Sequence, residues 1–182
     1  MNFSKGLITK QVSAQIKIKA PSQEVWKVIS KPGNLNYCHP FCMSNNVKKW
    51  GSVGAVDFIK YYNGICLKRI FTEWTEGKGY ELIIGNGKEA SAKVKWEIIP
   101  QNDFESLLII RINMLPTIIL KKYPTIFIAA LSKLYIIPNM KQYVESVVSG
   151  FKYYIETGSD VKLNQFGYNR MFSVKQIRYN KY

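Results

Sequence analysis

The sequence predicts an α+β domain in which a curved, seven-stranded antiparallel sheet wraps around a long C-terminal helix. Two observations lead to this prediction. Residues 138–158 form a long amphipathic segment, and short alternating segments separated by turn residues precede it. The apolar stripe of such a helix must cover an apolar surface, and an antiparallel sheet with one buried face provides one. At 182 residues the chain suits a single domain with a full core.

The closing helix is predicted from the spacing of its apolar residues. At the helical period, one side carries Met140, Tyr143, Val144, Val147, Val148, Phe151, Tyr154 and Ile155. Pro138 suits the first helical turn, and Gly158 suits the left-handed position after the last. Gly150 lies inside the helix, where glycine costs about 1 kcal/mol relative to alanine, so we expect close packing or room for a ligand there.

The strands are predicted from alternation and from the turns between them. A first strand at residues 13–20 is followed by a helix at 22–30 and an irregular connection with a short helical turn at 34–44. Six more strands are expected at residues 45–50, 56–62, 65–74, 79–84, 90–99 and 104–114. Asn63-Gly64 is the strongest turn signal, because a two-residue turn of this type takes positive φ at both positions and fixes the hairpin register.

Charge and composition limit the classes of function. The net charge of +14 comes from 26 basic and 12 acidic residues, but no dense basic block stands out, so we expect no nucleic-acid function. The three cysteines are odd in number and the N-terminus lacks the apolar core of a signal peptide, which predicts a cytoplasmic protein. The most apolar region, residues 107–137, is interrupted by charges and prolines, so no transmembrane helix is expected.

Four stretches carry a resemblance to a known family: IKIKAPSQEVWKVIS, GSVGAVDFIKYYNG, RIFTEW and YVESVVSGFKYYIETGSDVKLNQFGYNRMFS. The resemblance covers roughly residues 12–173. These stretches resemble the START-like, or SRPBCC, superfamily with the helix-grip fold, which includes polyketide cyclase/dehydrase and lipid-transport proteins. The resemblance implies one domain over residues 1–182 with its core at about 12–158. It also implies a cavity between sheet and helix for a hydrophobic or amphipathic small molecule, with no metal or fixed cofactor.

Two segments depart from the simplest pattern of that superfamily. Residues 115–137 are longer and more apolar than a plain loop, so we expect one or two short helices there. With Lys121, Lys122 and Lys133 they suit a lid, a dimer surface, a peripheral membrane contact or a covering piece of core. The tail, residues 159–182, is basic.

The ligand-binding candidates are large or polar side chains expected to face the interior. They are Phe58, Tyr61, Arg69, Phe71, Tyr80, Trp96, Arg111, Tyr143, Val147 and Phe151. The aromatic residues among them either line a cavity or fill it. An arginine in an apolar strand needs water, an acid or a ligand. For Arg69 the sequence offers Glu73, and for Arg111 it offers Glu97, Glu105 or Glu73.

The catalytic candidates are weak ones. His39 is the only histidine and sits at a predicted rim, and Glu73 is a second possible base. Cys38, His39 and Cys42, with Cys66 elsewhere, lack the spacing of a structural zinc site, so no metal site is expected.

The preferred interpretation is binding or carriage of a hydrophobic small molecule, a lipid or a polyketide-like compound, without turnover. One alternative is a cyclase/dehydratase-like enzyme that transfers a proton through tyrosine, Glu73 or His39. The other is a membrane-surface adaptor for a lipid or quinone. The oligomeric state is not indicated by the sequence.

Overall fold

The computed structural model describes residues 9–174 and confirms the predicted fold class. Seven strands form one antiparallel sheet in the spatial order β1-β7-β6-β5-β4-β3-β2. The strands are β1 (Lys10–Ile18), β2 (Cys42–Lys49), β3 (Val56–Tyr61), β4 (Cys66–Thr75), β5 (Gly79–Gly85), β6 (Ala90–Asn102) and β7 (Glu105–Met114). The helices are α1 (Ser22–Ile29), α2 (Leu35–Cys38), α3 (Pro116–Ile119), α4 (Thr125–Leu131), the π-helical turn η1 (Ser132–Ile136) and α5 (Ile137–Thr157).

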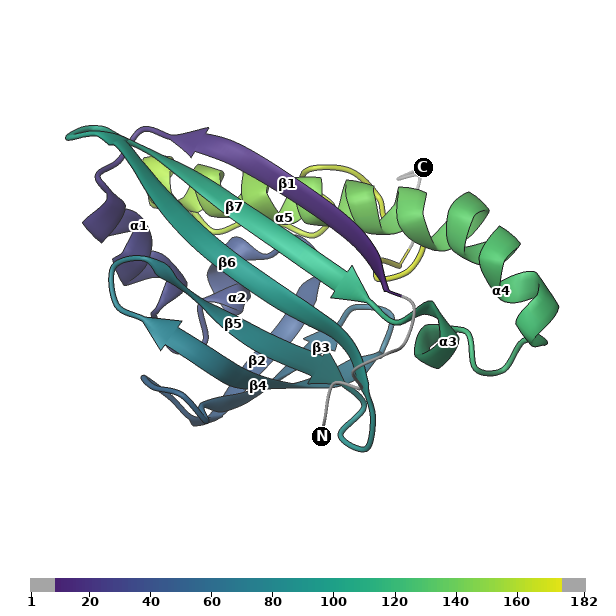
Figure 1. Cartoon of the computed structure of the whole chain (residues 1–182). Coiled ribbons are helices and arrows are strands. Elements are labelled where there is room, and N and C mark those ends of the chain that lie inside the picture. Colours follow the sequence, from purple (N-terminus) through teal and green to yellow (C-terminus); the bar gives the residue numbers. More distant parts are fainter. Residues whose placement is uncertain (1–8, 175–182) are drawn as a thin grey trace, which may run out of the picture.

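Helix α5 lies along the inner face of the sheet, beside β1 and β7, with α1 and α2 at one end (Figure 1). Five residues of the predicted stripe are buried: Met140, Val144, Val147, Val148 and Phe151. Tyr143, Tyr154 and Ile155 are partly buried, and Ser146, which the stripe did not include, is buried as well. The residues of the stripe pack against the inward-facing residues of the strands in one hydrophobic core. No helix within residues 9–174 is both long enough and apolar enough to span a bilayer.

The hairpin between β3 and β4 forms where Asn63-Gly64 predicts it, but with a different turn. Gly64 takes a positive φ of 88°, and Asn63 does not. The backbone N–H of Tyr61 donates to the carbonyl of Ile65 at 2.8 Å, which leaves a three-residue loop at 62–64. A three-residue loop shifts the pairing by one residue relative to a two-residue turn.

The start of the closing helix also differs from the prediction. Pro138 lies in the first turn of α5, but α5 continues directly from α4 and η1, so the helical segment begins at Thr125. The wider π-helical turn ends at Ile136, two residues before the proline, whose ring and missing N–H disturb regular α-helical bonding. At the other end Gly158 adopts φ 70° and donates its N–H to Tyr154 at 2.8 Å, as expected for a helix C-cap.

Gly150 of α5 packs directly against the C-terminal end of α2. A Cβ atom built at this position would lie 2.2 Å from the carbonyl oxygen of Cys38 and 3.2 Å from Cδ of Pro40. The glycine therefore provides close packing. It holds the segment that carries His39 directly against α5.

Candidate ligand-binding cavity

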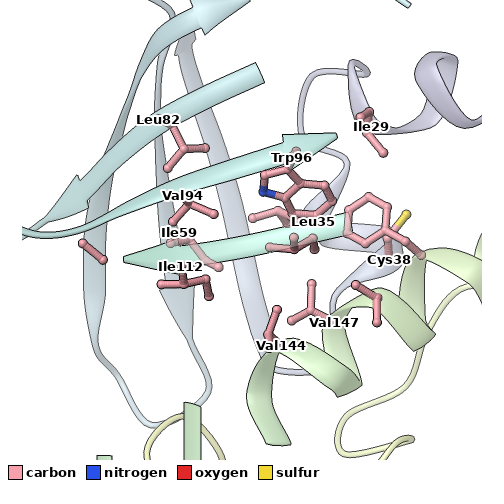
Figure 2. Packing of buried hydrophobic residues seen from close by; sticks show 14 of the residues in the cluster. Ile29, Leu35, Cys38, Ile59, Leu82, Val94, Trp96, Ile112, Val144 and Val147 are labelled. Atoms are coloured by element: carbon pink, nitrogen blue, oxygen red, sulfur yellow. The ribbon is translucent and has the colours of Figure 1, made fainter. Parts of the chain in front are cut away.

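A cavity of about 310 Å³ lies between the inner face of the sheet and α5. Figure 2 shows this interior, with Val144 and Val147 of α5 pointing toward Ile59, Ile112 and Trp96 of the sheet. The apolar lining residues are Leu35, Ile59, Ile65, Leu67, Leu82, Ile84, Ala92, Val94, Trp96, Ile110, Ile112, Met114, Ile119, Met140, Val144, Val147, Met171 and Phe172. The polar lining residues are His39, Tyr61, Arg69, Ser91 and Tyr143. The site is thus mostly apolar with a few polar groups, as small-molecule sites commonly are.

The lining is closed at one end and partly exposed at the other. Val144 and Ile110 have 0% and 1% of their surface exposed, whereas Ile65, directly after the β3–β4 turn, has 41%. Ile119 of α3 and Met171 are also partly exposed. The cavity therefore reaches the surface beside α3 and the β3–β4 hairpin.

The structure brings together five of the ten predicted ligand-binding residues, and they remain predictions as ligand contacts. Tyr61, Arg69, Trp96, Tyr143 and Val147 line the cavity, and so does the catalytic candidate His39. The other five do not: Phe58, Phe71, Tyr80, Arg111 and Phe151.

Those five residues fill space or face outward. The rings of Phe71 and Tyr80 pack at 5.0 Å between centroids, and Phe151 packs on Trp96 at 4.8 Å. Phe58 is only partly buried.

The two remaining charged candidates lie outside the cavity. Arg111 forms an ion pair with Glu97 at 2.5 Å, one of the structural pairs that the sequence allowed. Glu73 is exposed, so the catalytic candidate of β4 is outside the cavity.

A buried ion pair joins β3 to β4 at the cavity wall. Asp57 and Arg69 lie opposite each other in the register, with 0% and 4% of their surface exposed. Arg69 Nε donates to Asp57 Oδ1 at 2.6 Å, its Nη2 donates to Oδ2, and Asn45 Nδ2 donates to Oδ2 at 2.9 Å. Arg69 therefore pairs with Asp57, and not with Glu73, the one acidic partner that the sequence offered for it.

This ion pair keeps Arg69 charged but leaves part of its guanidinium free. Burial alone would lower the pKa of Arg69, yet the charge and hydrogen bonds of Asp57 raise it. Within residues 9–174, Asp57 accepts both of the hydrogen bonds that Arg69 donates. Since a guanidinium has five N–H donors, Arg69 can also donate to an oxygen atom in the cavity.

A second polar group is a chain of three side chains from separate elements. The backbone N–H of Phe41 donates to His39 Nδ1 at 3.1 Å, so Nδ1 is an acceptor and the ring proton sits on Nε2. Nε2 then donates to the Tyr143 hydroxyl at 3.0 Å, and Tyr143 and Tyr61 share one hydrogen bond of 2.9 Å. Tyr61 and Tyr143 have one hydroxyl hydrogen each, and the hydrogen bond that joins them uses only one of the two. The other is available to an acceptor in the cavity.

The protonation states of His39, Tyr143 and Tyr61 suit hydrogen-bond donation to a ligand better than proton transfer to or from it. Burial, reinforced by the positive charge of Arg69, lowers the pKa of His39 to about 3. Burial raises the pKa of Tyr143 to about 12 and that of Tyr61 well above its ordinary value. At neutral pH all three side chains are therefore uncharged, and none is poised to take up or release a proton.

Because His39 is the only histidine in the sequence, its lowered pKa predicts a specific loss of stability in acid. In the unfolded chain the imidazole takes up a proton below its ordinary value of 6.5, and in the folded chain only near 3. The contribution of neutral His39 to the free energy of unfolding is therefore complete above pH 6.5, and it falls as the pH drops toward 3. Between about pH 7.5 and pH 5 we expect a loss of about 2 kcal/mol in urea unfolding.

The matched variant is His39→Gln, which keeps a side-chain N–H donor but cannot titrate. Its free energy of unfolding should be nearly constant between about pH 7.5 and pH 5. An equal decline in both proteins would show that His39 is not buried in its neutral form.

The cysteines are free thiols, two buried and one exposed. Cys38 and Cys42 are buried, and burial raises the pKa of Cys42 to about 12. Cys66 is exposed at the start of β4. Residues 9–174 contain no group of three or more histidine, cysteine or acidic side chains that could hold a metal ion.

Some residues of the site were not among the candidates predicted from the sequence. Asp57 and Asn45 were not candidates, although together they fix Arg69. Met171 and Phe172, which line the cavity, come from the tail after α5. A signal for Asp57 was present, because it is the single charge facing inward in a strand that pairs with the strand of Arg69.

The sequence matches no protein-family model and no curated protein. Solved structures share the arrangement of sheet and helix. A protein from Thermus thermophilus superposes with a TM-score of 0.63 at 18% identity, covering 83% of this chain and 100% of that chain. A point mutant of norcoclaurine synthase from Thalictrum flavum, in complex with a transition-state analogue, superposes with a TM-score of 0.59 at 10% identity, covering 84% and 97%.

DynU16, from the dynemicin biosynthetic locus, superposes with a TM-score of 0.54 at 15% identity, covering 82% of this chain and 48% of that chain. At these identities the likeness concerns the fold. The chain has the helix-grip fold that the sequence resemblance implies.

Proposed function

We propose that this protein binds an apolar small molecule that carries an acceptor oxygen, and that it holds the molecule without converting it. The observation that carries the proposal is the cavity itself. Its walls are apolar over most of their area, and the hydrogen-bond donors that it leaves free are one hydroxyl hydrogen of the Tyr61–Tyr143 pair and the remaining N–H groups of Arg69. The Ser91 hydroxyl already donates to the Ile84 carbonyl. Its volume of about 310 Å³ lies at the lower end of the range of small-molecule sites.

A lipid or polyketide-like compound with a ketone, ester or phenol oxygen fits this chemistry. The oxygen would accept hydrogen bonds from the buried donors, and the hydrocarbon part would cover the apolar walls. Each well-formed hydrogen bond of this kind contributes about 0.5–1.5 kcal/mol. The ion pair with Asp57 neutralises Arg69, so the pocket does not require a ligand with a full negative charge.

A cyclase/dehydratase-like reaction is the second candidate, because the same donors would polarise a carbonyl group. Such a reaction needs a group that takes up a proton near neutral pH. His39 is held neutral by burial, the two tyrosines resist ionisation, and Glu73 lies outside the cavity. These observations favour binding over turnover.

A cavity-filling substitution tests the binding site. Val147→Phe places a larger side chain in the cavity, and we expect it to weaken binding of a fluorescent apolar probe by more than about tenfold, since overpacking removes the space the probe needs. Val53→Phe makes the same change at a position with 57% of its surface exposed, and binding should be unchanged. Equal affinity for all three proteins would show that the probe does not occupy this cavity.

The preference for an acceptor oxygen is tested by competition with two polycyclic compounds of one skeleton, one of them a ketone. We expect the ketone to displace the probe at about two- to tenfold lower concentration than the compound without the ketone.

Native mass spectrometry of the purified protein then identifies a co-purifying compound. Recovery of that compound with unchanged mass after incubation supports binding, and conversion supports the enzyme.

A further inference from the structure

Helix α4 and the turn η1 expose an apolar surface, which we call the α4 face. It consists of Ile126, Phe127, Ala130 and Leu134. Ile126, Ala130 and Leu134 are spaced four residues apart, so they lie on one side of the helix, with Phe127 beside them. Ile126 and Leu134 have 82% and 78% of their surface exposed, and α4 contains no buried residue. The helix extends beyond the edge of the sheet (Figure 1).

The charged residues in the segment that carries the α4 face are all basic. Residues 115–137 contain three lysines and no acidic residue. Lys121 forms an ion pair with Glu89 at 2.6 Å. Within the described part of the chain, Lys122 and Lys133 have no acidic partner, and both are exposed. An apolar helical side flanked by unpaired lysines suits the boundary between anionic headgroups and acyl chains.

We propose that the α4 face docks on an anionic membrane surface. Ile126, Phe127 and Leu134 then enter the acyl boundary, and Lys122 and Lys133 lie among the headgroups. A second copy of the chain is a poorer occupant, because it would bring together the lysines of two proteins that each carry a net charge of +14. The charge therefore favours an anionic bilayer over a second copy of the chain.

Docking in this way has a consequence for the cavity. Ile119 of α3 lines the cavity where its wall is partly exposed, and α3 is joined to α4 by the short segment 120–124. The mouth would therefore lie near the bilayer. This step, from membrane docking to the cavity, rests on the proposed function. It identifies the bilayer as the source of the ligand, which would pass from the bilayer into the cavity without crossing water.

Sedimentation with lipid vesicles tests the proposal. The full chain should bind vesicles of phosphatidylcholine mixed with phosphatidylserine, and bind vesicles of phosphatidylcholine alone much more weakly. Raising the salt from about 0.1 M to about 1 M should weaken binding, because the Debye length falls from about 10 Å to about 3 Å. Binding that is equal on both vesicles, or absent from both, would overturn the proposal.

Matched variants locate the contact. Leu134→Glu should weaken vesicle binding by more than about tenfold, since an apolar contact is lost and a negative charge is added. Phe104→Glu makes the equivalent change at a side chain with 79% of its surface exposed, between β6 and β7 at the far end of the sheet, and should weaken it much less (Figure 1). Equal effects of the two changes would show that α4 does not make the contact.

A second pair of variants tests the charge. Replacing both Lys122 and Lys133 with glutamine should weaken binding about fivefold for each lysine. The same loss of charge at Lys27 and Lys78, exposed residues in and near α1, should have a smaller effect. If the two double variants bind equally, net charge rather than the α4 face is responsible.

Two further measurements separate the possible outcomes. Sedimentation equilibrium that shows a dimer of the unchanged chain, abolished by Leu134→Glu, would assign the face to self-association and overturn the proposal. Val147→Phe should bind vesicles like the unchanged chain, because Val147 is buried far from the α4 face in α5. Membrane docking and cavity binding can thus fail independently.

Discussion

Arg69→Met should lower the free energy of unfolding by about 3–5 kcal/mol, the largest effect we expect from a single substitution in this chain. The change leaves the carboxylate of Asp57, which is fully buried, with only Asn45 as a side-chain partner. A buried charge that loses its partner keeps the cost of leaving water and loses the attraction that offset it. Urea unfolding at neutral pH measures the effect.

Two controls make this result specific. The double variant Asp57→Leu with Arg69→Met removes both charges and should recover most of the lost stability, since apolar pairs of similar volume commonly replace buried ion pairs at little cost. Lys27→Met breaks the exposed pair with Glu24 and should change stability by no more than about 0.5 kcal/mol. A loss for Arg69→Met as small as that for Lys27→Met would contradict the prediction.

Gly150→Ala is expected to lower the free energy of unfolding by about 2 kcal/mol or more. Alanine is the better helix former by about 1 kcal/mol, so helix propensity alone predicts the opposite sign. The new Cβ would lie 2.2 Å from the carbonyl oxygen of Cys38, and a backbone atom cannot avoid it by changing rotamer. Helix α2 must move away from α5 instead, at a cost typical of overpacking.

The neighbouring position supplies the control for this prediction. Ser149 bonds only to the carbonyl of Glu145 in its own helix, so Ser149→Ala should leave stability unchanged or raise it slightly. Because Cys38 precedes His39, displacement of α2 by Gly150→Ala should also weaken the His39–Tyr143 hydrogen bond. A Gly150→Ala protein as stable as the unchanged chain would show that the two helices separate at no cost.

The fold was predictable from periodicity because the helix and the strands each repeat at their own spacing over many residues. The pairing of Arg69 was not, and the reason is one residue in a turn. A two-residue turn at Asn63-Gly64 would place Asp57 opposite Ile70, whereas the three-residue loop places it opposite Arg69. A shift of one residue moves every side chain to the other face, so the ion pair was hidden by a small error in backbone geometry.

The cavity could be predicted only in part for a different reason. Alternation groups the side chains of a strand into two faces, but it does not tell which of them touch one another. The rings of Phe71, Tyr80 and Trp74 pack on one another with centroids 5.0–5.5 Å apart, and none of the three lines the cavity. The pairing between β4 and β5 is irregular at Phe71 and Glu73, which brings Trp74 into that cluster, and no sequence signal marked it. Near Tyr61 and Tyr143 the space stays open.

The order of the strands has a consequence for how the chain folds. The neighbour of β1 in the sheet is β7, the last strand, and Val12 lies opposite Ile112. During synthesis β1 must wait, without a strand partner, until nearly the whole sheet has been made. Closing so long a segment before any contact compensates for it makes folding slow, and until β1 arrives the edge of β7 is open to other chains. The step that completes the sheet is therefore the joining of its first and last strands.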